Sequence, residues 1–227
     1  MSIGLVSPYS GVFFDLDGTL ADTAPDLVAA ANQLLLARNL SPMPYEVLRP
    51  RSSAGARGLI HGAFGITPDH PDFITLRDEF LAHYESALLV HSKLFEGVDH
   101  LLDQLDSAKL PWGIVTNKSE RFTHPLTDQM GLRQRAASTV SGDTTPHSKP
   151  HPAPILHAAK IANVDPTKAL YIGDDIRDIV AGKAAGMQTI TAAYGYCGCE
   201  EPPEDWGADY LVRHPKELLQ IIFPSRE

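Results

Sequence analysis

Short apolar runs recur along the chain, and a stretch with helical periodicity follows each of them. The runs lack a regular polar alternation and are rich in β-branched and aromatic residues, which is typical of strands buried on both faces. The predicted strands are residues 11–16, 112–116, 137–140, 169–173, 188–192 and 210–212. Because strands alternate with helices, we predict an α/β fold with a doubly wound parallel sheet.

The interval between the first two predicted strands is far longer than a simple crossover requires. About 95 residues lie between them, and apolar residues recur there at helical spacing. Thr23 and Asp26 fit a capping box at the start of a first helix, with Pro25 in its first turn. Two further helices are expected over residues 54–64 and 73–89.

These helices are expected to form a cap domain inserted after the first strand. The predicted division is a catalytic core made of residues 1–21 and 92–227 and a helical cap made of residues 22–91. The two connections, residues 20–24 and 91–97, are expected to act as hinges.

Composition and charge narrow the classes of function. The chain has 227 residues and a formal net charge of −9, with 43% hydrophobic and 21% charged residues, a balance typical of a globular protein. An acidic chain does not favour nucleic acid or an anionic membrane, and no apolar stretch approaches the roughly 20 residues that span a bilayer. Cys197 and Cys199 are too few for a disulfide framework. We therefore expect a cytoplasmic monomer or homodimer that acts on a small molecule.

Polar side chains cluster where the predicted strands end. The residues in these positions are Asp15, Asp17, Gly18, Thr116, Asn117, Lys118, Lys149, Asp174, Asp175 and Asp178. The carboxyl ends of parallel strands meet at one edge of a sheet, where such folds bind ligands. An isolated Asp-x-Asp segment would more simply form an acidic turn, but the hydroxyl, lysine and second acid group at the same edge favour a site. Gly18 allows a sharp turn there and is expected to lie against the substrate.

The chemistry of these residue types indicates phosphoryl transfer. Asp15 and Asp174 could bind Mg²⁺, which prefers carboxylate and water oxygens. The cation would reduce the repulsion between a carboxylate nucleophile and a phosphate dianion. Lys149 provides a compact positive charge for a phosphoryl oxygen. Asp17 could protonate a leaving oxygen and then deprotonate water.

Further residues are expected to contact the substrate. The Thr116 hydroxyl and the backbone N–H of Asn117 can hold a phosphoryl oxygen, and Lys118 lies beside them. In the expected cap, Arg57 could bind a substrate carboxylate through two hydrogen bonds, although the sequence fits a solvated helix-end charge equally well. Arg51 is a second, less favoured candidate for the same role.

Four segments resemble, in order, the four motifs of the haloacid dehalogenase superfamily of phosphohydrolases, and together they cover nearly the whole chain. They are Asp15-Leu16-Asp17-Gly18-Thr19-Leu20-Ala21-Asp22-Thr23, Thr116-Asn117-Lys118, Ser148-Lys149-Pro150 and Gly173-Asp174-Asp175-Ile176-Arg177-Asp178. The resemblance implies a Rossmann-like core with a helical cap after the first motif. It implies that Asp15 is the nucleophile that forms an aspartyl-phosphate and that Asp17 is the acid and base. It also implies a Mg²⁺ site formed by Asp15, the Asp17 backbone carbonyl and Asp174, with Asp178 and Asp175 as orienting groups.

The resemblance is nearest to the phosphoglycolate phosphatase family. It implies hydrolysis of a small phosphate ester that also carries a carboxylate. The chain also resembles N-acetylmuramic acid 6-phosphate phosphatases. The acid at Asp175 slightly favours this sugar-phosphate alternative. A β-phosphoglucomutase-like phosphomutase is a further alternative, in which the aspartyl-phosphate would have to outlive attack by water. A binding module on an inactive phosphatase fold is a third reading, but every position that carries the chemistry is filled.

Overall fold

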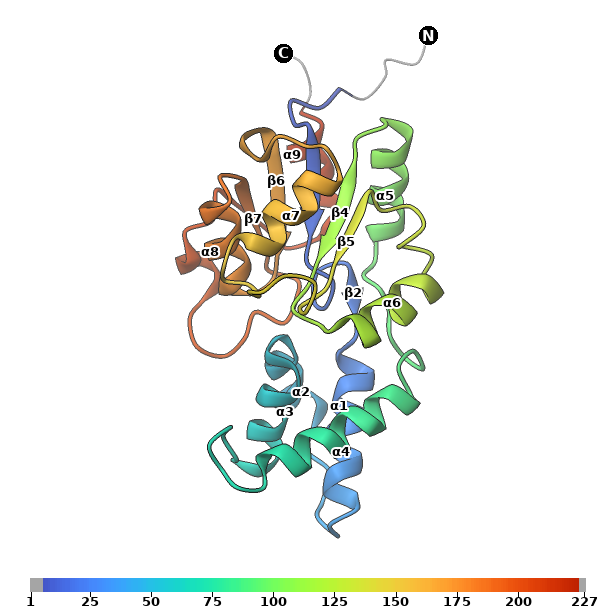
Figure 1. The fold of residues 1–227 in the computed structure, drawn as a ribbon, viewed down its shortest axis with the longest axis vertical. Coiled ribbons are helices and arrows are strands. Elements are labelled where there is room, and N and C mark those ends of the chain that lie inside the picture. The colour runs from blue at the N-terminus through green and yellow to red at the C-terminus, as the bar shows by residue number, and fades with distance from the viewer. Residues whose placement is uncertain (1–5, 225–227) are drawn as a thin grey trace.

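A computed structural model describes residues 6–224, and its centre is a six-stranded sheet (Figure 1). The strands are β1 (Gly11–Phe14), β4 (Trp112–Val115), β5 (Ser138–Val140), β6 (Ala169–Gly173), β7 (Gln188–Ala192) and β8 (Tyr210–Val212). They lie in the order β5-β4-β1-β6-β7-β8, and every neighbouring pair is parallel. All the predicted strands are present, and the prediction of a doubly wound α/β fold is confirmed.

The central strand β1 is buried on both faces because its residues alternate between two hydrophobic clusters. Val12 and Phe14 pack into one cluster, and Phe13 packs into the other. The Phe14 ring meets the Trp112 ring of β4 edge to face, with 6.5 Å between their centroids. An uninterrupted apolar run is what such a strand needs, since helices cover both sides of it.

Helices from residue 98 onward cover the two faces of the sheet. The cluster around Val12 and Phe14 includes residues of α5 (Val98–Ser107), α6 (Glu120–Gln129) and α9 (Leu218–Ile222). The cluster around Phe13 includes residues of α7 (Ala153–Ile161) and α8 (Ile176–Ala184). Within residues 6–224, none of the helices combines the length and the apolar character needed to cross a membrane.

A second group of helices lies beyond the carboxyl edge of the sheet, in the lower half of Figure 1. They are α1 (Ala24–Leu36), α2 (Tyr45–Leu48), the 3-10 helix η1 (Arg49–Ala54), α3 (Gly55–Phe64) and α4 (Phe73–Ser86). These helices enclose a hydrophobic cluster of their own, in which Leu34, Leu59 and Phe80 are almost wholly buried, and Phe122 of α6 joins it from the sheet side. The last helix ends at Ser86, earlier than predicted, because the next residue leaves the helical backbone conformation.

Two short strands mark where the chain enters and leaves this group of helices. β2 (Ala21–Asp22) pairs with β3 (Lys93–Leu94) in antiparallel orientation. The two connections therefore lie side by side, as a pair of hinges would. They fall within the segments expected to act as hinges, residues 20–24 and 91–97.

The predicted capping box of α1 is wrong. Thr23 occupies the N-cap position without a capping hydrogen bond, and its hydroxyl donates to Asp17 Oδ1. The Asp26 carboxylate accepts backbone N–H groups of residues 90–92 at 2.9–3.1 Å, and the Ser92 hydroxyl at 2.6 Å. Several donors satisfy a buried carboxylate better than one N–H of its own helix would. Asp26 thereby ties the second connection to the first turn of α1.

Candidate active site

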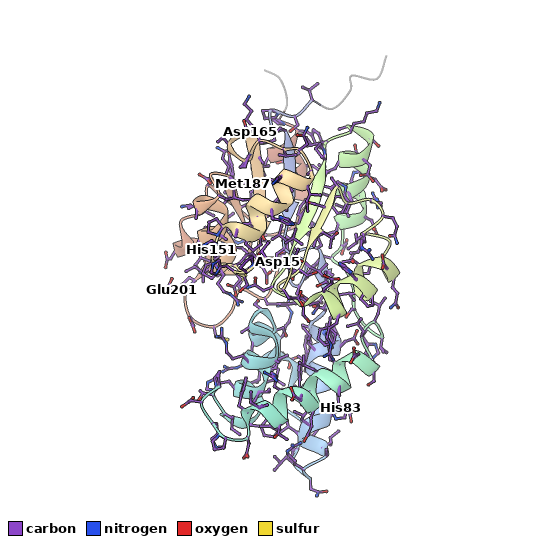
Figure 2. The ribbon with its side chains drawn as sticks, viewed as in Figure 1. Asp15, His83, His151, Asp165, Met187 and Glu201 are labelled. Carbon is purple, nitrogen blue, oxygen red and sulfur yellow. The ribbon has the colours of Figure 1, made fainter. Side chains whose placement is uncertain are left out.

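Three strands deliver polar residues to the carboxyl edge of the sheet. The Asp15 N–H donates to the carbonyl of Ile172 at 2.9 Å, and the Thr116 N–H donates to the carbonyl of Val140 at 3.0 Å. These hydrogen bonds continue the parallel ladder one residue past β1 and β4. Asp174 follows β6, so residues distant in sequence meet at one edge. In Figure 2, Asp15 lies where the sheet faces the second group of helices.

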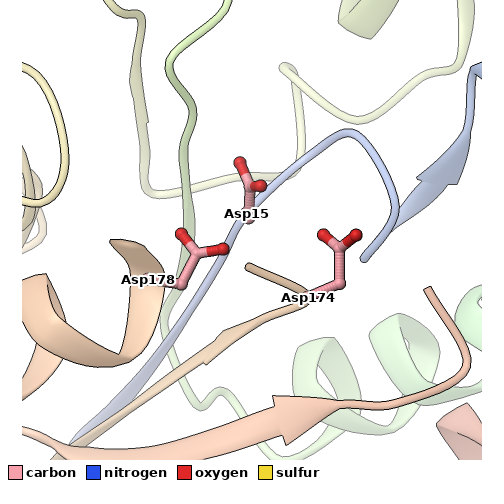
Figure 3. A group of neighbouring side chains, drawn as sticks. All are labelled: Asp15, Asp174 and Asp178. Atoms are coloured by element: carbon pink, nitrogen blue, oxygen red, sulfur yellow. The ribbon is translucent and has the colours of Figure 1, made fainter. Parts of the chain in front are cut away.

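Three carboxylates form the centre of this edge (Figure 3). Oxygens of Asp15, Asp174 and Asp178 all lie within 4.8 Å of one another, and the last two residues are 0% and 1% exposed. Burial raises the pKa of Asp15, against the opposing charge of Lys149. Burial, followed by the charges of Asp15 and Asp178, raises the pKa of Asp174 well above its ordinary value. Burial also raises the pKa of Asp178 to about 7.

Lys149 supplies a buried positive charge to these acids. Its Nζ donates to the Val115 carbonyl at 2.7 Å, to the Tyr171 hydroxyl at 2.9 Å and to Asp178 Oδ1 at 2.7 Å. These three bonds use all the hydrogens of an ammonium group. Asp15 Oδ1 lies 2.9 Å from the same Nζ but is buried without a hydrogen-bond partner among the described residues. That oxygen is therefore held near a positive charge yet remains available to a further ligand.

The acids fit a hard divalent cation such as Mg²⁺. Asp15 Oδ1 lacks a hydrogen bond within residues 6–224, and such an oxygen gains most from a metal ion. Asp174 is oriented by the Tyr196 N–H, which donates to its Oδ2 at 2.9 Å. Asp178 is less available because Lys149 already occupies its Oδ1. The geometry thus favours Asp15 and Asp174 over Asp178 as metal ligands, and leaves Asp178 to orient Lys149.

Gly18 forms the turn that brings the first acid pair against Asp174. Its φ of +84° lies in the left-handed region, and a Cβ there would collide with the Asp174 carboxylate. The Gly18 N–H donates to the Ala21 carbonyl at 2.9 Å and closes the turn. The structure therefore places Gly18 beside a candidate metal ligand.

Asp17 lines the same cavity as Asp15 and is paired with Lys118. The Lys118 Nζ is 3.0 Å from Asp17 Oδ1 and 4.7 Å from the centre of the Tyr84 ring, which comes from α4. Burial alone would lower the pKa of Lys118, but the charges of Asp17 and Tyr84 raise it above its ordinary value. Lys118 therefore stays charged and holds Asp17. It also lines the cavity described below.

Asn117 supports Lys149 through its side chain. Its Nδ2 donates to the Lys149 carbonyl and its Oδ1 accepts the Lys149 N–H, both at 2.9 Å. The sequence pointed only to the Asn117 backbone and missed this clamp. It also missed Tyr171, a single hydroxyl within the apolar strand β6, whose oxygen contacts Lys149. The Thr116 hydroxyl accepts the Lys118 N–H at 3.1 Å, so its proton remains free to point into the cavity.

Asp175 and Arg177 connect the sheet edge to the second group of helices. The Asp175 carboxylate caps α8 and accepts Nε and Nη2 of Arg177 at 2.7 and 2.8 Å. Burial opposes ionisation, but the Arg177 bonds and charge lower the pKa of Asp175. Arg177 Nη2 also donates to the Ser53 carbonyl of η1 at 2.7 Å, and the Ser53 hydroxyl donates to Asp174 Oδ2 at 3.3 Å. The contact between Arg177 and Ser53 could not be predicted from the sequence, because the two residues are more than a hundred positions apart.

A second clamp lies on the opposite side of the site. Arg49 donates to the Gly195 carbonyl at 3.0 Å, and its guanidinium lies 5.0 Å from the centre of the Tyr196 ring. The Tyr196 hydroxyl accepts the N–H groups of Thr23 and Ala24 at 2.7 and 2.8 Å. The loop after β7 therefore holds both η1 and the start of α1.

A cavity of about 380 Å³ lies between the sheet edge and the second group of helices. The predicted site residues that line it are Asp15, Asp17, Arg57, Thr116, Asn117, Lys118, Lys149, Asp175 and Asp178. Leu27, Phe80 and Phe122 give it an apolar wall. Arg57 is exposed and forms no ion pair within the part of the chain that the structure describes. One cavity thus collects most residues singled out from the sequence.

The chain is similar to known proteins of one enzyme family. A profile of the haloacid dehalogenase-like hydrolases matches residues 12–192, so the chain belongs to this family. An N-acetylmuramic acid 6-phosphate phosphatase from Pseudomonas putida is 44% identical over 211 residues, which cover 93% of this chain and 95% of the relative. A phosphoglycolate phosphatase from Xanthomonas campestris pv. campestris is 43% identical over 212 residues, which cover 92% and 94%.

A solved structure agrees with the fold as well. A predicted phosphoglycolate phosphatase from Haemophilus somnus superposes with a TM-score of 0.83 at 26% identity, over 95% of this chain and 99% of that one. The predicted family and the predicted class of enzyme, a phosphoric monoester hydrolase, are confirmed by these matches.

Proposed function

We propose that this chain is a Mg²⁺-dependent phosphomonoesterase that works through an aspartyl-phosphate on Asp15. The observation that carries the proposal is the state of the Asp15 carboxylate. It lies at the end of the central strand, 2.9 Å from a buried ammonium, with one oxygen that lacks a hydrogen bond among the described residues. Such a carboxylate is fixed in place and its charge is partly offset, as a nucleophile that approaches a phosphate requires.

In the proposed reaction, a carboxylate oxygen of Asp15 attacks phosphorus and the bond to the alcohol oxygen breaks. Asp17 gives its proton to that oxygen, then removes a proton from the water that releases inorganic phosphate. The Thr116 hydroxyl and the Asn117 N–H hold phosphoryl oxygens. Asp15, the Asp17 carbonyl and Asp174 would hold Mg²⁺, which offsets the charge of the phosphate.

Lys118 positions Asp17 for its proposed role, because its Nζ lies 3.0 Å from Asp17 Oδ1. An incoming phosphate dianion would also be attracted to this ammonium.

We further propose that residues 22–91 act as a cap that closes over the site and excludes water. The contacts of Ser53 and Arg49 with the sheet edge support this role, since they hold the helices over the cavity. We also propose that the enzyme acts in the cytoplasm.

The proposed substrate joins a phosphate to a carboxylate, and Arg57, which lines the catalytic cavity, is one candidate contact for the acid. Phosphoglycolate and N-acetylmuramic acid 6-phosphate, which appear in the names of relatives, both meet this description. The cavity of about 380 Å³ lies within the range of roughly 300–1,000 Å³ typical of small-molecule sites and leaves room for the sugar phosphate as well as the smaller acid. Paired kcat/KM values for the two substrates would decide, and a difference of about 10²-fold corresponds to about 2.7 kcal/mol.

The mechanism is tested by release of p-nitrophenol from p-nitrophenyl phosphate with and without Mg²⁺. Asp15→Asn should lower kcat by at least about 10³-fold, while Asp99→Asn, at an exposed position of α5, should leave it unchanged. Wild-type turnover by Asp15→Asn would show that the nucleophile is wrongly assigned.

A further inference from the structure

A second cleft adjoins the catalytic cavity and has no role in the reaction proposed above. Its volume is about 580 Å³, and it lies between η1 and α3 on one side and the loop after β7 on the other. Ser53, Ala54, Arg57, Asp175 and Arg177 line both this cleft and the catalytic cavity. The two spaces are therefore adjacent at these residues, where Arg177 Nη2 donates to the Ser53 carbonyl at 2.7 Å, and a ligand anchored at Asp15 would reach past this contact from one into the other.

Arg51 is the distinctive residue of the second cleft. Its side chain crosses α3 at Gly62, where a Cβ would lie 2.5 Å from Arg51 Cδ and 3.1 Å from its Nε. Because Gly62 has no side chain, the Arg51 side chain can lie against α3 on its way to the cleft. Arg51 Nε is buried, and among the described residues it has no hydrogen-bond partner.

Two arginines of the cleft have no acid partner. The cleft is lined by three arginines and three acids, but Arg177 is paired with Asp175, and neither Arg51 nor Arg57 pairs with an acid in the described part of the chain. A partly buried guanidinium without partners is costly, and a carboxylate can satisfy it through two hydrogen bonds. Glu200 and Glu201 line the side of the loop after β7, so an anion would bind at the side of Arg51 and Arg57.

We infer that the second cleft binds a carboxylate of the substrate that is remote from the phosphate, with Arg51 as its main contact and Arg57 at the junction. The inference rests on the proposed function, because the phosphate must lie at Asp15. Arg51 lines the second cleft but is not among the described residues around the catalytic cavity. The alcohol part of the substrate must therefore be long enough to pass Ser53, which defines a phosphorylated sugar acid and excludes a two-carbon acid.

Three phosphate esters test this inference. N-acetylmuramic acid 6-phosphate carries the carboxylate, N-acetylglucosamine 6-phosphate is the same sugar without it, and p-nitrophenyl phosphate reports the chemistry alone. Arg51→Met should lower kcat/KM for the acid by at least about tenfold and leave the other two esters within about twofold. Arg77→Met is the matched control, since Arg77 pairs with the adjacent Asp78 on α4, and all three values should remain unchanged.

The wild-type enzyme supplies a second measurement that does not depend on the folding of a variant. Unphosphorylated N-acetylmuramic acid should inhibit more strongly than N-acetylglucosamine, by at least about tenfold. Equal kcat/KM for the acid and the neutral sugar phosphate, or an equal loss on all three esters in Arg51→Met, would overturn the inference and leave the proposed function intact. A wild-type enzyme that hydrolyses none of the three esters would overturn both.

Discussion

At the scale of single residues, Lys149 determines the state of the acids around it. Burial would lower the pKa of its ammonium, but the charges of Asp15 and Asp178 raise that pKa well above the ordinary value. Its side chain is 2% exposed, so water cannot replace it as a partner. The ammonium is therefore both a structural counter-charge and an electrostatic partner for the proposed nucleophile.

Replacement of Lys149 by methionine should destabilise the fold as well as impair turnover. The substitution keeps the apolar part of the side chain but leaves the buried carboxylates without their positive partner. Removal of one partner of a buried ion pair costs about 3–5 kcal/mol. We expect the free energy of unfolding, measured by urea denaturation at neutral pH, to fall by that amount. Lys160→Met, at an exposed position of α7, should change it by no more than about 0.5 kcal/mol. Equal stability of the two variants would contradict this account of Lys149.

The residue types at the site could be predicted, but their partners could not. Asp15 and Lys149 follow from strand ends and motif order, because parallel strands bring their carboxyl ends to one edge. The amide of Asn117 and the hydroxyl of Tyr171 both contact Lys149 across at least 22 positions of the chain. Such contacts depend on how side chains pack after the strands have paired, and no spacing rule in the sequence encodes them.

At the scale of elements, Asp26 joins the start of α1 to the second of the two connections expected to act as hinges. Its carboxylate accepts hydrogen bonds from the N–H groups of His91 and Ser92. Thr23, one helical turn before Asp26, donates its hydroxyl to Asp17. The Tyr196 hydroxyl holds the same end of α1. The hinge region is thus fixed by polar contacts of buried groups, and a change at any of them should alter how firmly the helices are attached.

Asp26→Asn should weaken this attachment. The amide keeps one acceptor oxygen, but its NH₂ group would face backbone N–H donors of residues 90–92. Since hydrogen bonds to charged groups contribute about 1.5–3 kcal/mol each, we expect a loss of about 2–3 kcal/mol in the free energy of unfolding. Denaturant unfolding is the measurement, with Asp99→Asn as a control that removes an exposed carboxylate. A loss no larger than the control's would mean that these bonds do not stabilise the hinge.

The long elements could be predicted from the sequence, whereas the strand pair within the two expected connections could not. Each strand of the sheet is an apolar run, and the helices repeat their apolar residues over several turns. β2 and β3 have two residues each, too few for any period to appear. Asp26 fitted a local capping rule, but three N–H groups from the far connection offered its carboxylate more hydrogen bonds.

At the scale of the whole molecule, the proposed cap rests on the sheet edge through a small set of polar contacts. Arg177 reaches the Ser53 carbonyl and Arg49 reaches the Gly195 carbonyl. Ser53 also donates to Asp174, a residue proposed to hold Mg²⁺. Closure of the cap and occupancy of the metal site are therefore expected to affect each other, and both depend on buried acids whose charge varies with pH.

This dependence predicts that Mg²⁺ stabilises the chain more at pH 7.5 than at pH 5. Burial raises the pKa values of the proposed ligands Asp15 and Asp174 in the folded chain, and it raises that of the neighbouring Asp178 to about 7. Between about pH 4 and pH 7 the folded chain then binds more protons than the unfolded one, so without metal its stability falls as pH rises. Mg²⁺ binds the ionised acids and should restore that loss at the upper end of the range.

Urea denaturation with EDTA or with Mg²⁺ at both pH values measures the effect. At about one hundred times its Kd, Mg²⁺ should add about 2.7 kcal/mol to the free energy of unfolding at pH 7.5, and less than half of that at pH 5. Asp174→Asn should remove most of the increment, because it deletes a proposed ligand, while Asp99→Asn should retain it. An equal increment at the two pH values would show that the buried acids do not bind the metal, and the donor set would have to be sought elsewhere.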